Sequence, residues 1–260
     1  MLSRRLLQGL YCTSRQKRIE PCLIVGSKRN LSFNDGGNED NRQFIPKLMN
    51  MEMRLVPSLM HRIRNFFFEH GIIRPYFDPD FSKHNFLKGA KSAIEFVSSC
   101  IAEGDYTTLK ESQVLTEDCL REIIMNMTLV SPENRRKIAV KQEDIQLNFI
   151  YQIGVMLEDD PKPTRHVEIT YVAHVLTDDL IDSAENKEDM LRNAIGNQEY
   201  KNLRILESDI FLFFNLDYQI LVNYRFIRNY TKGVEDSWTI NALNHITLRQ
   251  LLKQRSDEMN

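Results

Sequence analysis

The chain has 260 residues, of which 42% are hydrophobic and 27% are charged, and its formal net charge is −2. This length and composition suffice for one sizeable core and do not require two, so we expect one domain behind an N-terminal extension. A helix that crosses a bilayer needs about 20 consecutive apolar residues. No apolar run in the sequence approaches that length, and we therefore expect no transmembrane helix.

Residues 1–33 differ in charge from the rest of the chain, with seven basic residues and a single acid, Glu20. Several leucines can share one face of a short helix that begins beside Arg4 and Arg5. This basic, amphipathic and acid-poor pattern is typical of a mitochondrial presequence. A secretory signal needs an uninterrupted apolar centre. The basic residues Arg15, Lys17 and Arg18 interrupt the apolar stretch here, so a secretory signal is not expected. The alternative is a basic tail that binds nucleic acid.

Without residues 1–33 the chain keeps 27 basic and 35 acidic residues, a net charge of −8. Neutralising phosphates requires a positive surface, so this excess of acid argues against broad nucleic-acid binding, although it leaves room for a local basic patch. We predict no specific nucleic-acid partner. Cys100 and Cys119 remain in this part of the chain, in apolar helical patterns and outside any CxxC pair. We expect both to be buried and reduced, as suits a reducing compartment.

Residues 34–53 are predicted to form a flexible linker, because the linker opens with a polar, glycine-rich run. The stretch 56–73 then predicts a helix with Pro57 in its first turn and Gly71 at its end. Its cationic and aromatic residues are candidates for a membrane-surface site: Arg62, Arg64, Phe66, Phe67 and Phe68. Such a helix either packs on the domain as an ordinary amphipathic element or lies at an anionic membrane surface.

Residues 82–102 predict a long helix, because apolar residues recur there at intervals of three and four. The stripe consists of Phe86, Ala90, Ala93, Ile94, Val97 and Ile101. Shorter helices are expected at 106–111 and 116–127, the second with Thr116 as its N-cap. A further helical turn is expected to follow Ser131 and Pro132.

Strand patterns dominate the second half of the chain. Alternation of apolar and polar residues predicts strands at 144–157, 167–176, 220–230 and 238–246, and a short apolar run predicts another at 209–216. Residues 177–200 are polar and acidic and are expected to form an excursion at the sheet edge. Helices followed by antiparallel strands make residues 54–260 an α+β domain, in which the long helix packs on a curved sheet. Trp238, the only tryptophan, is expected to anchor the core.

The mixture of small and large residues in the long helix suggests a concave apolar pocket rather than a filled core. Besides the stripe from Phe86 to Val97, we expect its lining to include strand residues Phe211, Phe213, Phe226 and Trp238. A preformed apolar pocket could hold an apolar segment of a client protein.

No motif for chemistry is present. The sequence has no GxxxxGK[ST], GxGxxG, HExxH or CxxC. His166 and His174 are eight residues apart on one strand, too far to share a metal without a third element. We therefore predict no catalytic residues, no metal and no cofactor. An enzyme that uses the pocket of the fold stays an alternative, and an acid and a histidine facing inward would distinguish it.

Two stretches carry a resemblance to a known family: YFDPDFSKHNFLKGAKSAIEFVS at 76–98 and NYRFIRNYTKGVEDSWTINALNH at 223–245. They resemble the mitochondrial m-AAA protease-interacting proteins, which belong to the wider family of the inner-membrane import-motor tether and a mitochondrial large-subunit ribosomal protein. The likeness extends in order over residues 54–248, and it is weakest at 159–206. The family implies a cystatin-like or NTF2-like α+β cone with a hydrophobic hollow under its sheet.

The resemblance also implies a function. It suggests a non-enzymatic adaptor or chaperone of the mitochondrial matrix, peripheral to the inner membrane. Such a protein binds the m-AAA protease and newly imported inner-membrane proteins such as EMRE, whose sorting supports assembly of the calcium uniporter. The alternative within the family is a structural component of the mitochondrial ribosome or of a translocase. That role would call for a long basic extension on the mature chain, and the net charge of −8 weighs against it.

Overall fold

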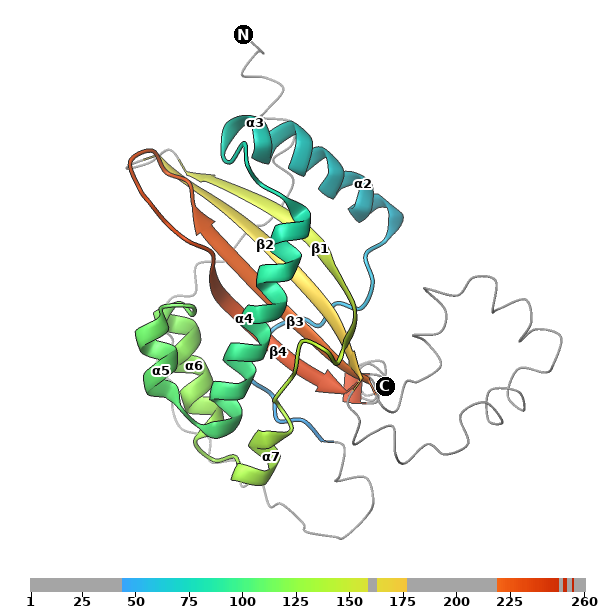
Figure 1. Ribbon diagram of the computed structural model, residues 1–260, viewed down its shortest axis with the longest axis vertical. Helices are drawn as coiled ribbons and strands as arrows, with labels where there is room; N and C mark the ends of the chain where they lie inside the picture. The colour runs from blue at the N-terminus through green and yellow to red at the C-terminus, as the bar shows by residue number, and fades with distance from the viewer. Residues whose placement is uncertain (1–43, 159–162, 177–218, 248–249, 252–253, 255–260) are drawn as a thin grey trace, which may run out of the picture. The chain divides into compact units, whose positions relative to one another are not determined.

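The computed structural model describes residues 44–158, 163–176 and 219–247, together with residues 250, 251 and 254 (Figure 1). All of them belong to one compact unit. The expected presequence, the polar excursion at 177–200 and the expected strand at 209–216 lie outside the described residues. Phe211 and Phe213, two of the candidate pocket residues, therefore lie outside them as well.

The centre of the fold is a four-stranded antiparallel sheet with the strand order β1-β2-β3-β4. Its strands are β1 (Ile145–Glu158), β2 (Thr164–Leu176), β3 (Gln219–Asn229) and β4 (Thr239–Thr247). Each strand pairs with its neighbour in sequence, and β3 and β4 form the hairpin that the sequence predicted, with its turn between Asn229 and Thr239. The four expected strands within the described residues are confirmed.

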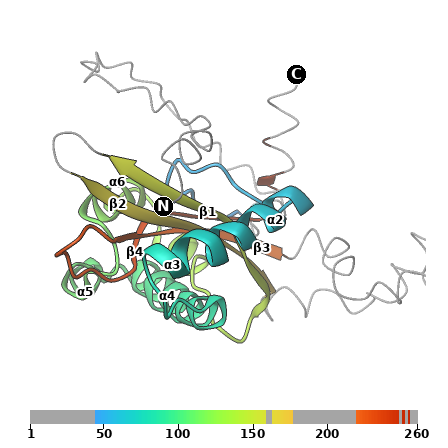
Figure 2. The same ribbon diagram turned by 90° about the horizontal axis from the view of Figure 1, so that it is seen from above.

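The helix α4 (Lys83–Glu103) crosses one face of this curved sheet (Figures 1 and 2). Alternate residues of β3, among them Val222, Tyr224 and Phe226, point to this inner face and are buried against the helix. Ser82 caps the start of α4, and Gly104 ends it in the left-handed conformation, with φ of 80°. The expectation of an α+β fold with helices packed on a curved antiparallel sheet is thus confirmed.

Three shorter helices follow α4 at one end of the sheet. They are α5 (Tyr106–Ser112), α6 (Glu117–Met127) and α7 (Pro132–Arg136). Their N-terminal amides are capped by the side chains of Asp105, Thr116 and Ser131, respectively. These are the residue types that satisfy free amides at helix starts, and Thr116 and Ser131 were predicted in these positions. Cys100 and Cys119 are buried free thiols of this helical layer.

The helix predicted at 56–73 has different boundaries in the structure. It begins as α2 (Leu59–Phe68), continues as a π-helical turn, η2 (Glu69–Ile73), and ends as α3 (Arg74–Tyr76). Ser58 caps α2 through a hydrogen bond that the His61 amide donates, so Pro57 precedes the helix instead of opening it. Gly71 does not end the helix: it lies within the η2 turn, and only positions 104 and 233 among the described glycines have positive φ.

The described part of the predicted linker is packed onto the domain. Residues 44–53 contain no helix or strand, yet Leu48 is fully buried, and Ile45, Met49 and Met53 are each less than 8% exposed. The linker was predicted from the polar run at 34–41, but the apolar residues that follow this run belong to the core. Apolar residues outside a regular element have no period, which is why the sequence pattern did not reveal them.

Candidate functional site

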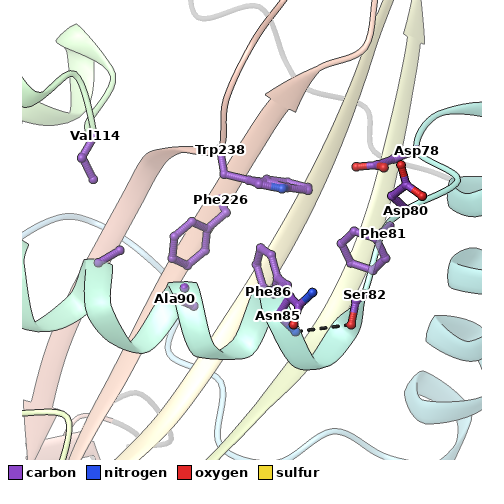
Figure 3. Close-up of a pocket in the computed structure, with 12 residues that line it drawn as sticks. Asp78, Asp80, Phe81, Ser82, Asn85, Phe86, Ala90, Val114, Phe226 and Trp238 are labelled. Atoms are coloured by element: carbon purple, nitrogen blue, oxygen red, sulfur yellow. Dashed lines mark hydrogen bonds between the residues drawn. The ribbon is translucent and has the colours of Figure 1, made fainter.

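A pocket of about 390 Å³ opens between the first half of α4 and the β3–β4 hairpin (Figure 3). Phe81, Phe86, Ala90 and Ala93 come from α4 and the turn before it, Phe226 comes from β3, and Trp238 comes from the hairpin loop directly before β4. Figure 3 shows the Trp238 ring lying over Phe86, with Ala90 and Phe226 beneath and Val114 at the far end. The lining is largely apolar, as is usual for sites that hold apolar ligands.

Small residues of α4 leave the space that the pocket occupies. Gly89, Ala90 and Ala93 lie along the wall, and a Cβ atom built on Gly89 would meet no atom within 4 Å. The larger stripe residues Ile94 and Val97 are fully buried in the core beneath the sheet, and they do not line the pocket. The structure therefore divides the predicted stripe into a pocket wall and a core face.

Trp238 belongs to the pocket more than to the core. We expected a core anchor, but its side chain is only partly buried: it precedes β4 at the end of the hairpin and packs against the core from there. Its ring contacts Phe86 edge to face, with centroids 5.2 Å apart, and it lies 6.4 Å from Phe81 and 6.3 Å from Tyr230. Edge-to-face aromatic pairs fix the orientation of the rings as well as burying them.

The rim of the pocket at the N-terminal end of α4 is polar and acidic. It is formed by Asp78, Asp80, Ser82 and Asn85, none of which the sequence predicted as site residues. The Asp78 carboxylate accepts hydrogen bonds from the Arg228 guanidinium and from the Tyr230 hydroxyl, both at 3.1 Å. The sequence signals this rim only through the turn residues Asp78, Pro79 and Asp80, which lie shortly before Ser82, the N-cap of α4.

This ion pair joins the turn before α4 to the hairpin. The Arg228 guanidinium also donates to the backbone oxygen of Asp236 at 3.0 Å and stacks over the Tyr230 ring, 4.7 Å from its centroid. Burial raises the pKa of the Tyr230 hydroxyl, so the hydroxyl stays protonated and donates to Asp78. The two sides of the pocket mouth are therefore held together by charge-assisted hydrogen bonds.

The residues that line the pocket carry few ionisable groups. They include two aspartates but no histidine, cysteine or lysine. Across the part of the chain that the structure describes, no three His, Cys, Asp or Glu side chains lie close enough to hold a metal ion. The arrangement can bind an apolar group beside an acidic rim.

The second candidate site is the outer face of α2. Leu59, Met60 and Ile63 are exposed there, and the rings of Phe66 and Phe67 are 59% and 65% exposed. At 100° per residue these five side chains share one side of the helix, and the exposed Arg62 and Arg64 border it on opposite edges. Exposed apolar residues that form a contiguous patch usually mark an interaction surface.

Phe68 does not belong to this patch, although the sequence grouped it with Phe66 and Phe67. It is partly buried against the core, and the Arg64 guanidinium lies 5.7 Å from its ring centroid. The opposite face of α2 is fixed to the sheet by the buried Asn65, which hydrogen-bonds to the backbone of β1. None of the helices in the described ranges is both long and apolar enough to cross a bilayer.

Comparison with known proteins gives a distant likeness, and no family model matches the chain. Curated proteins of three mammals, all named "m-AAA protease-interacting protein 1, mitochondrial", match it. The mouse protein is 25% identical over 178 residues, the human protein 25% over 183 and the rat protein 24% over 178. Each match covers 68% of this chain and 55% of the relative. The chain thus spans about half the length of the curated relatives it matches, and it is distantly similar to m-AAA protease-interacting proteins.

Proposed function

We propose that this protein is a non-enzymatic mitochondrial adaptor that binds the m-AAA protease. The observation that carries the proposal is the likeness to proteins named for that interaction, which extends over 68% of the chain. The basic, acid-poor character of residues 1–33 agrees with mitochondrial import. The excess of acid in the rest of the chain favours a protein partner over nucleic acid.

In its more specific form, the proposal places the protein in the matrix, peripheral to the inner membrane. There it binds newly imported inner-membrane proteins such as EMRE, promotes their sorting and so supports assembly of the calcium uniporter. An adaptor for such clients needs apolar surfaces that are accessible in the folded protein. The pocket beside Trp238 and the outer face of α2 are two surfaces of this kind.

Affinity purification of the tagged full-length protein from mitochondria tests the proposal. We expect subunits of the m-AAA protease to be enriched over a tagged matrix protein of similar size and charge. Enrichment of ribosomal proteins without protease subunits would favour the structural alternative and contradict the adaptor role. Recovery of neither would also contradict it.

The pocket is the surface that we propose for apolar client segments. Ala93→Phe should fill it and reduce crosslinking to a newly imported hydrophobic client at least tenfold, because the added ring occupies the space that the client would fill. Ser92→Phe is the matched control: it adds the same ring to the neighbouring, exposed position of α4, so crosslinking should stay unchanged.

Gly89→Leu is a second way of filling the pocket. Its Cβ meets no atom within 4 Å, and replacing a mid-helix glycine removes a cost of about 1 kcal/mol, so this variant should stay folded. If both filled variants keep the circular dichroism spectrum of the parent and still crosslink to the client, clients bind elsewhere and the pocket proposal is wrong.

The outer face of α2 is the surface that we propose for the inner membrane. The apolar side chains can enter the acyl boundary while Arg62 and Arg64 meet anionic headgroups. Replacing Ile63, Phe66 and Phe67 together by Ser should lower binding to cardiolipin-containing liposomes at least tenfold. These side chains are exposed, so the thermal midpoint should change little.

A matched triple replacement on α6 and the turn after it provides the control. Ile124, Met125 and Leu129 are also exposed, so their replacement by Ser removes similar apolar surface at another site. Binding should then equal that of the parent. If the two triple variants lose liposome binding equally, exposed apolar residues bind the membrane regardless of their position. If neither variant loses liposome binding, α2 does not contact the membrane.

A further inference from the structure

The packed segment 44–55, which we call the arm, is bound to the domain in an unusual way. It contains no helix or strand, and it passes from the β4 side of the sheet across the face opposite α4 to the start of α2 (Figures 1 and 2). Its backbone is held by side chains of the domain, because no strand pairs with it. Side chains can bind an extended backbone in this way, because amide side chains offer both donors and acceptors.

Two side-chain amides each hold one arm residue at both its N–H and its C=O. Asn223 of β3 accepts from the Arg54 amide at 2.8 Å and donates to the Arg54 carbonyl at 3.0 Å. Gln250 accepts from the Ile45 amide at 3.2 Å and donates to its carbonyl at 3.1 Å. A carboxamide carries both a donor and an acceptor, so it can replace a neighbouring strand for one residue.

Leu48, between these two positions, is held by two separate amides. Its N–H donates to Asn244 of β4 at 3.0 Å, and its C=O accepts from Asn126 of α6 at 2.7 Å. Asn223 is fully buried and Asn244 is 4% exposed. Buried amides that lost these partners would cost about 1–3 kcal/mol each, so the domain requires a backbone in this place.

The arm adds apolar side chains at fixed spacings. Ile45, Leu48 and Met49 pack into the main core, and Met53 packs with Val172 and Leu221 on the outer face of the sheet. The domain forms hydrogen bonds to the arm backbone at residues 45, 48, 50, 54 and 55, and every polypeptide without proline there has the same groups. One arm side chain takes part as well, because the Leu243 amide donates to the Met49 sulfur at 3.4 Å. Sequence specificity therefore comes from the side chains at the apolar positions and at Arg54, whose guanidinium lies 5.5 Å from the centroid of the Tyr151 ring.

We propose that β4, α6 and the face of the sheet opposite α4 together form a groove for extended apolar polypeptide segments, which the arm occupies in cis. The occupant that can replace the arm is a segment of another protein with apolar residues at the spacing of Ile45, Leu48 and Met53. The arm is then autoinhibitory: it covers the groove until a competing segment displaces it. This proposal does not depend on the protease or on mitochondrial import.

Covalent attachment explains why the arm holds the groove. A tethered segment has an effective concentration on the order of millimolar, so a free peptide at micromolar concentration cannot compete with it. The test must therefore remove the tether and keep the arm. Val56 is 38% exposed and lies between the last arm contact and the cap of α2, so a specific protease site can be inserted after it.

The experiment uses the full-length chain with this site inserted, either cut or uncut. The probe is a fluorescent peptide with the sequence of residues 43–56. We expect it to bind the cut protein at least tenfold more tightly than the uncut protein. An unrelated extended peptide with apolar residues at the same spacings should compete, and a peptide with aspartate in place of Leu48 and Met53 should not.

Three results would overturn the proposal. If the cut protein unfolds when its arm fragment is diluted away, the arm is an integral part of the core. If the probe binds cut and uncut proteins equally, it binds elsewhere. If only the chain's own sequence competes, the groove serves the arm alone. Asn223→Leu in the cut protein removes both bonds to Arg54 and should weaken probe binding about tenfold, with the spectrum of a folded protein retained.

Discussion

Asn65→Leu is expected to lower the free energy of unfolding by roughly 3–5 kcal/mol, because it leaves buried backbone groups without partners. The Asn65 side chain donates to the carbonyls of Ile150 and Tyr151, at 3.2 and 3.0 Å, and accepts from the Ile153 amide at 3.0 Å. These groups lie at the bulge where the β1 register shifts against β2. Leucine would leave three backbone groups buried without partners.

Urea unfolding of the parent and the variant would measure this loss. Asn134→Leu is the control, because Asn134 is exposed on α7, and there the change should stay within about 0.5 kcal/mol. The Ile153 amide should also exchange with solvent faster in the Asn65 variant, since its acceptor is gone. A loss below about 1 kcal/mol would mean that water replaces the amide and that α2 depends little on this anchor.

Asn65 also shows what sequence patterns could and could not predict. The apolar stripe of α2 was visible, but a stripe does not say which of its sides faces the protein. The helix is buried on the side of Asn65 and Phe68, and Phe66 and Phe67 are left exposed. A polar residue that fills a backbone bulge is fixed by tertiary contacts, for which the local sequence holds no signal.

The long helix and the strands were predictable for the opposite reason. In α4 and in the four strands, apolar residues recur with the period of the element, because one face of each is buried in a single core. The wall of the pocket followed from the small residues Ala90 and Ala93. Its acidic rim did not, since the Asp78 carboxylate is held by Arg228 and Tyr230, which lie 150 and 152 residues away in the chain.

A second large effect on the free energy of unfolding is expected when the pH is lowered. His245 is 1% exposed, and burial lowers the pKa of its imidazole to about 3, against a usual value of 6.5. Its Nε2 atom lies 3.2 Å from the hydroxyl of Tyr224, another fully buried residue. Burial raises the pKa of that hydroxyl, so Tyr224 stays neutral across the whole acidic range.

The sign of the pH dependence follows from these values. Between pH 6.5 and about 3 the unfolded chain binds a proton at His245 and the folded chain does not, so stability is complete above the unfolded pKa and falls as the pH falls. Each unit of pH in this window costs about 1.4 kcal/mol. From pH 7.5 to pH 5.0 this histidine alone should therefore remove roughly 2 kcal/mol from the free energy of unfolding.

His245→Gln isolates this contribution, because its amide can still hydrogen-bond to Tyr224 and does not titrate. Urea unfolding at pH 7.5 and pH 5.0 should show that the variant loses roughly 2 kcal/mol less than the parent between the two conditions, whatever its stability at pH 7.5. His84→Gln, at an exposed position of α4, is the control and should lose as much as the parent. If all three proteins lose equal stability, protonation of His245 does not oppose folding, and the imidazole must be reached by water in the folded state.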